Sequence, residues 1–109
     1  IRHGEAVAIG VALDCIYSST VHGLATDYCH KAIKCLADMG LPTFHPLMRN
    51  TDEILVGLEE FRQHLGGILT VTLIESPGHP INVHSISQKI MRDSINELES
   101  LSQELGSSL

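Results

Sequence analysis

The feature that most constrains the fold of this chain is an apolar segment at residues 5–21, which reads EAVAIGVALDCIYSSTV. Small and apolar residues occupy nearly every position around its helical wheel, and Asp14 is the only charged residue after Glu5. A helix that is apolar on every side is ordinarily buried on every side. The segment therefore predicts a helix that needs covering structure all round.

The next part of the chain predicts two shorter helices with recognisable ends. One has Thr26 as its N-cap and stops at Gly40. The other begins at Thr51 or Asp52, carries an apolar stripe at helical spacing, and ends at the paired glycines 66–67.

The pattern then changes from helical to β. Residues 68–75 are β-branched with a period of two, which indicates a strand, and the turn SPGHP leads to a partner strand at residues 81–86. Ser85 with Gln88 predicts a capping box for a last helix, whose apolar face covers residues 90–105.

The predicted fold class is therefore mainly α, a single helical domain over residues 1–109 with a small β-hairpin before the last helix. Three short helices and a hairpin cannot cover all sides of the first helix. The chain also does not begin with methionine. We therefore expect it to be a piece of a larger protein.

Composition excludes several classes of partner. A net charge of −6 with few, scattered Lys and Arg residues leaves no basic patch, so we expect no nucleic-acid partner. No apolar run reaches the roughly 18 residues of a membrane span, so we expect neither a membrane partner nor a signal peptide. The odd number of cysteines, without CxxC spacing, predicts reduced thiols in the core of a cytoplasmic protein: Cys15, Cys29 and Cys35.

The triplet at the start of the apolar segment carries the first candidate for chemistry. His3 stands just before the predicted helix, beside Gly4 and Glu5. An imidazole held there could bind a metal ion, and the Glu5 carboxylate could orient a ligand or a water molecule. The alternative is a solvated histidine at a helix N-terminus, where Glu5 favours the helix dipole.

The longer stretch HGEAVAIG resembles the start of the C-terminal helical domain of the 3-dehydroquinate synthase family, the sugar-phosphate cyclases. The resemblance continues, in the family's order, through GLPT at residues 40–43 and GGILTVTL at residues 66–73. It implies that His3 is one of three protein ligands of a catalytic divalent metal, Zn²⁺ or Co²⁺. The other two ligands, and a nucleotide-binding domain that holds NAD, would lie upstream of this chain, in an enzyme that is a homodimer.

One departure from the family concerns the substrate. Dehydroquinate synthases carry an Asp-Lys-Lys triplet before the strand, and this chain has LEEFRQHLGG there. Either Arg62 or His64 could face an anion, and His45, in the loop sequence FHPLM, could reach the active-site cleft. The pattern is similar to the divergent, valiolone-synthase-like branch, which implies a heptulose 7-phosphate as the phosphorylated sugar substrate.

The resemblance implies a reaction in which NAD transiently oxidises the substrate, phosphate is eliminated, and an intramolecular aldol step closes a carbocycle. Two alternatives remain open: a metal-dependent alcohol or glycerol dehydrogenase, and a non-enzymatic helical interaction module. Phosphate release separates a cyclase from a dehydrogenase.

Overall fold

The computed structural model describes residues 3–54, 56 and 71–106. This part of the chain is mainly helical, with a small antiparallel hairpin before the last helix, as the sequence predicts. The elements are, in order, α1 (His3–Val21), α2 (Thr26–Asp38), the 3-10 helix η1 (Pro46–Arg49), β1 (Val71–Ser76), β2 (His79–Val83) and α4 (Gln88–Leu105).

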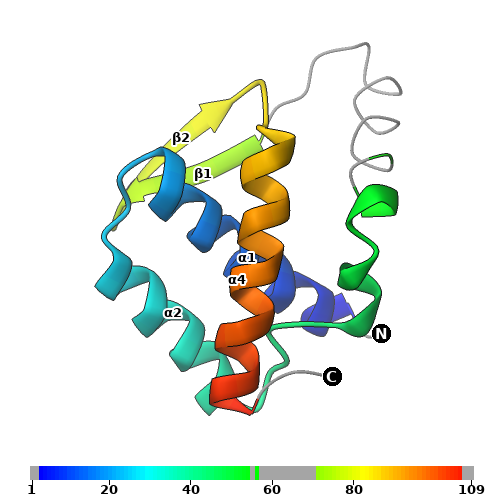
Figure 1. Ribbon diagram of the computed structural model, residues 1–109. Coiled ribbons are helices and arrows are strands. Elements are labelled where there is room, and N and C mark those ends of the chain that lie inside the picture. Colours follow the sequence, from blue (N-terminus) through cyan, green and yellow to red (C-terminus); the bar gives the residue numbers. More distant parts are fainter. Residues whose placement is uncertain (1–2, 55, 57–70, 107–109) are drawn as a thin grey trace.

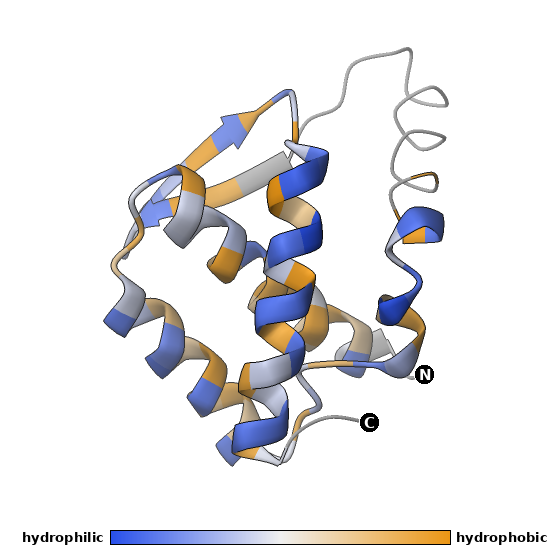
Figure 2. Cartoon of the chain, in the orientation of Figure 1, coloured by the Kyte–Doolittle hydropathy of each residue, from blue (hydrophilic) through white to orange (hydrophobic). Residues whose placement is uncertain are grey.

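Helix α1 is the centre of the arrangement (Figure 1), and it packs against α2, α4 and β1. Helix α4 crosses α1, and the hairpin lies beside the C-terminal part of α1. The apolar faces of α2 and α4 are turned inward and their polar faces outward (Figure 2). The largest fully buried apolar side chains of the core come from all these elements: Phe44, Ile16, Leu24, Ile33, Leu73, Ile95 and Leu98.

Helix α1 is not covered on every side, as expected because the other elements of this chain are too few to surround it. Val7 and Val11 are 49% and 43% exposed, although Ala8, Ala12 and Ile16 on the opposite face are buried. The physical reason is that α2, α4 and β1 pack against one side of the helix. Its length and hydropathy over Gly4–Val21 meet the criterion for a membrane span, although no run of that length is expected from the sequence; core helices of soluble proteins and signal sequences meet the same criterion.

The second helix ends as predicted but begins differently. Gly40 has a φ of +82° and closes α2 in a Schellman motif, in which Gly40 N–H donates to Ala37 and Leu41 N–H donates to Leu36. Thr26 is not the N-cap. It is the first helical residue, after Ala25, and its hydroxyl lies 3.4 Å from Ser19 Oγ instead of capping the helix.

The last helix is capped by a serine two residues beyond the predicted one. Ser87 Oγ accepts the N–H of Ile90, 3.3 Å away. The N–H of Ser87 donates to the Tyr17 hydroxyl on α1 at 2.8 Å. This tertiary contact selects Ser87 over Ser85, since both serines suit the local rule for a cap.

The hairpin is confirmed, but its second strand is shifted: β2 spans His79–Val83 and not residues 81–86, because the turn is tighter than the predicted SPGHP. Strands β1 and β2 are antiparallel, with Leu73 opposite Ile81, and Gly78 takes a φ of +76° in the turn. Leu73 is buried against the core, and the N–H of Ile74 donates to Ser18 Oγ on α1 at 3.4 Å. Residues 68–70 of the predicted strand lie outside the described part.

The third helix begins at residue 51, as predicted, and its continuation beyond residue 56 lies outside the described part. Arg92 on α4 anchors its first turn by a hydrogen bond of 3.1 Å to Thr51 and an ion pair with Asp52. A second ion pair, between Arg49 and Glu99, holds η1 to α4.

Candidate functional site

His3 is the first residue of α1, within the helix and not just before it as the sequence predicts. Glu5 lies in the same first turn and is half-buried. A carboxylate in that position interacts favourably with the positive end of the helix dipole. Both residues of the HGE triplet that could take part in metal chemistry are therefore on a packed helix, and not on a loop.

The loop that carries His45 is held by the residues on either side of it. Thr43 Oγ1 and Ser102 Oγ of α4 are 2.6 Å apart in the interior, and the Phe44 side chain is fully buried. The Arg49 guanidinium lies over the Phe44 ring, 5.6 Å from its centre. These contacts fix the backbone of His45 relative to the core.

His45 is half-buried and caps η1 through its ring. Its Nδ1 accepts the N–H of Leu47 at 3.1 Å. Because Nδ1 is the acceptor, the neutral imidazole carries its proton on Nε2. The ring therefore has one nitrogen committed to the backbone and one N–H group available to donate.

The His45 side chain lines an apolar cavity of about 270 Å³. Helix α1 contributes Ala6 and Ile9 to this cavity, and the other lining residues are Leu47, Met48 and Ile54. Residues three apart on a helix share a face, so Ala6 places the cavity one turn from His3. Two residues that the sequence singles out separately, His3 and His45, are thus brought to the same end of α1.

The two remaining candidates for substrate contact, Arg62 and His64, lie outside the described residues. The choice between them therefore stays open, as it is in the sequence.

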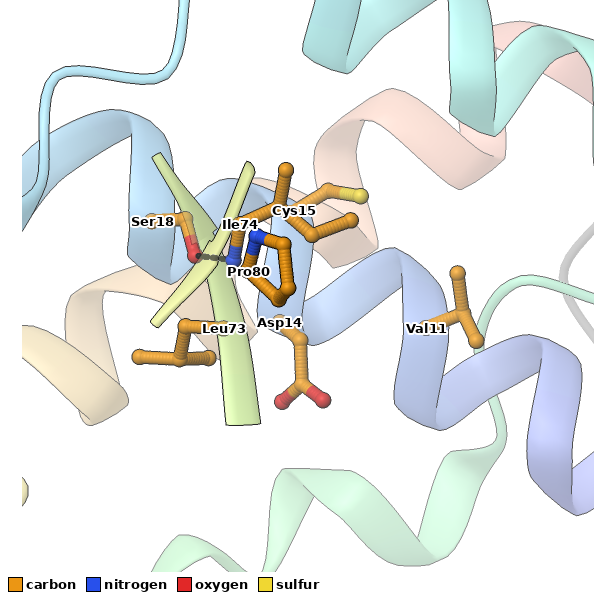
Figure 3. A pocket seen from close by; sticks show the side chains of 7 residues that line it. All are labelled: Val11, Asp14, Cys15, Ser18, Leu73, Ile74 and Pro80. Atoms are coloured by element: carbon orange, nitrogen blue, oxygen red, sulfur yellow. Dashed lines mark hydrogen bonds between the residues drawn. The ribbon is translucent and has the colours of Figure 1, made fainter. Parts of the chain in front are cut away.

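A second cavity, which the sequence analysis did not predict, lies between α1 and the hairpin (Figure 3). It measures about 320 Å³, and among the residues that the structure describes Asp14 is the one charged residue that lines it. Burial raises the pKa of the Asp14 carboxyl to about 6. Its signal in the sequence is that Asp14 interrupts an otherwise apolar helix.

The cysteines are free thiols. Cys15 and Cys29 are buried in the core as predicted, whereas Cys35 is exposed, because it lies on the outer face of α2. Burial raises the pKa of the Cys29 thiol to about 12, and burial followed by the charge of Asp14 raises the pKa of Cys15. Both core thiols are therefore uncharged near neutral pH and are poor nucleophiles.

No group of three or more His, Cys, Asp or Glu side chains is placed to hold a metal ion within residues 4–54 and 73–106 or at Val56. A catalytic zinc site usually has three protein ligands. The donors of this part of the chain do not make such a site without ligands from elsewhere.

Comparison with known proteins found no protein family, no curated protein and no solved structure that matches this chain. The residues that the structure describes form a mainly α-helical fold. One cavity lined by His45 and another lined by Asp14 lie along its central helix.

Proposed function

We propose that this chain is the C-terminal helical part of an NAD- and divalent-metal-dependent sugar-phosphate cyclase, similar to 3-dehydroquinate synthase. In this proposal a heptulose 7-phosphate is the substrate and His3 is one of the metal ligands. The nucleotide-binding domain, the NAD site and the other two ligands belong to a part of the protein upstream of Ile1.

The observation that carries the proposal is the position of the HGEAVAIG motif. It occupies the first two turns of α1, and the cavity that begins one turn from His3 is lined by a second histidine, His45. A ligand in the first turn of a helix whose later turns pack into the core has a backbone of fixed geometry, which is what a metal centre needs.

His45 supports the same assignment by its hydrogen bonding. With Nδ1 accepting the N–H of Leu47, the ring has a defined orientation and its Nε2–H is the group left to donate to a ligand. A neutral imidazole donor suits the hydroxyl and phosphate oxygens of a sugar phosphate. His45 therefore acts in the proposal as a group that binds and orients the substrate.

The metal, when bound, would polarise the hydroxyl and carbonyl oxygens of the substrate. His3 would contribute one nitrogen ligand, and Glu5, half-buried in the same turn, would orient that ligand or a water molecule. The anion-binding role falls to Arg62 or His64, as the departure from the Asp-Lys-Lys pattern suggests.

The experiment that tests the proposal measures metal content and NAD binding in the complete protein. His3→Ala should lose bound metal, because one of three ligands is gone, and should still bind NAD. His30→Ala is the matched control, since His30 is an exposed histidine on α2. Metal content equal in His3→Ala and His30→Ala would contradict the role of His3.

The same preparation separates the alternatives. A dehydrogenase would reduce NAD with an alcohol and release no phosphate, whereas an interaction module would bind neither metal nor NAD.

A further inference from the structure

The cavity between α1 and the hairpin has features that the proposed cyclase chemistry does not use. The residues of α1 that line this cavity are centred on Asp14. Because α1 rises about 1.5 Å per residue, the cavity lies roughly 16 Å along the helix from His3. It is separate from the cavity lined by His45, with which it shares no residue.

The described residues that line the cavity combine apolar side chains with one hydroxyl, one thiol and one carboxylate. The hairpin contributes Leu73, Ile74 and Pro80, and α1 contributes Val11, Cys15, Ser18 and Asp14. The Ser18 hydroxyl already accepts the N–H of Ile74, and the Cys15 thiol is uncharged because burial and Asp14 raise its pKa. Among the described residues of α1 and the hairpin, Asp14 therefore supplies the one charge that faces the cavity.

The Asp14 carboxylate has no hydrogen bond and no ion pair to any other residue that the structure describes. In Figure 3 it lies between Leu73 of the hairpin and Val11 of the same helix. A carboxylate among apolar side chains loses hydration without gaining a partner, and that loss favours the binding of a cation.

The geometry points to this cavity as a binding site for a small primary amine with a compact apolar body. The ammonium group would pair with the Asp14 carboxylate, and the apolar body would lie against Leu73, Ile74 and Pro80. The volume of about 320 Å³ is at the lower end of the range for small-molecule sites, so the ligand is a compact one.

The site predicts a pH dependence of a definite sign. Burial raises the pKa of Asp14 to about 6, and the amine stays protonated well above that pH. Binding should therefore strengthen as the pH rises from 5 to 7, while the carboxyl ionises. By linkage, the bound ammonium should lower the pKa of Asp14.

Benzylamine and its neutral analogue benzyl alcohol are the probes that test the site, with the complete protein labelled at its methyl groups for NMR. Benzylamine at pH 7 should shift the methyl signals of Val11, Leu73 and Ile74, and should bind about tenfold more tightly than benzyl alcohol. In Asp14→Asn, which keeps the shape of the side chain, the two probes should bind equally.

Val11→Phe is the second variant, because the half-exposed Val11 can be enlarged without disturbing the core. The larger side chain should fill the mouth of the cavity and weaken the binding of both probes. The proposal is overturned if benzylamine leaves these methyl signals unchanged, as it would if a basic side chain of the complete protein already occupied the cavity. It is also overturned if Asp14→Asn keeps the preference for the amine. Neither result depends on metal binding, so the test is independent of the cyclase proposal.

Discussion

The hydroxyl of Tyr17, a buried residue near the C-terminal end of α1, accepts a 2.8 Å hydrogen bond from the backbone N–H of Ser87. Ser87 is also the residue whose side chain caps α4. One contact therefore fixes where the last helix begins and ties it to the central helix.

Tyr17→Phe should lower the free energy of unfolding by about 1 kcal/mol, because the N–H of Ser87 loses its acceptor in a partly buried position. Urea unfolding of the complete protein measures this. Tyr28→Phe is the matched control, since Tyr28 is 37% exposed on α2 and should change stability little. If the two variants lowered the free energy of unfolding equally, the Tyr17 hydroxyl would not hold α4.

Asp14→Asn should stabilise the protein above pH 6 and have little effect below pH 4. The pKa of Asp14 is raised from 3.8 to about 6 in the folded protein, so the folded state binds the proton more tightly than the unfolded state does. The stability that this proton binding gives is complete below the unfolded pKa and is lost as the pH rises to about 6.

Urea unfolding of the wild-type protein and of Asp14→Asn between pH 4 and pH 8 tests this direction of the pH dependence. Glu75→Gln, which removes an exposed carboxylate on β1 away from any helix N-terminus, corrects for the change in net charge. If Asp14→Asn raised the free energy of unfolding by as much at pH 4 as at pH 8, that result would contradict the burial of this carboxyl.

Two substitutions test the roles of the two ring nitrogens of His45 separately. Asn places its amide oxygen near the position of Nδ1, so His45→Asn should keep the hydrogen bond from Leu47 N–H and with it the stability. Gln reaches the position of Nε2 but does not cap η1, so His45→Gln should lose about 0.5–1.5 kcal/mol.

If Nε2–H contacts the substrate, phosphate release should fall about tenfold or more in His45→Asn and less in His45→Gln. Unfolding curves and phosphate assays on the same two proteins check both halves of the prediction. Identical phosphate release by the two variants would remove His45 from substrate binding.

The sequence predicts the local ends of the elements better than their tertiary surroundings. Gly40 ends α2 because a φ of +82° suits glycine, and that preference is visible in the sequence. The cap at Ser87 was missed because Tyr17, 70 residues away, decides between two serines. Contacts at such separations are not encoded in a local pattern.

The same distinction holds for the candidate site: the sequence identifies single residues, and the fold shows which of them lie together. His3 and His45 can be selected from their sequence surroundings, but only the fold shows that both lie at one end of α1. Asp14 carries no motif, and its chemistry arises from the hairpin that packs over it. The sequence predicts that α1 is not fully covered, but only the fold shows that Val7 and Val11 are among the residues left half-exposed.

The exposed face of α1 leads to a prediction about the isolated chain. Residues 1–109 expressed alone should bind a dye for apolar surfaces and unfold without a sharp transition, because Val7 and Val11 lie uncovered on the central helix. The complete protein should bind little dye. Cooperative thermal unfolding of residues 1–109 without dye binding would show that this face needs no further cover.

The most direct test of the central claim is phosphate release by the complete protein from a heptulose 7-phosphate, with NAD and Zn²⁺ present. We predict that phosphate is released, that release requires both NAD and the metal, and that no NADH accumulates, because the oxidation is reversed within each turnover. Faster release from the carboxylate-bearing substrate of dehydroquinate synthase would contradict the substrate proposed here and leave the cyclase class intact. Accumulation of NADH without phosphate, or no release from either substrate, would contradict the assignment of this chain to a sugar-phosphate cyclase.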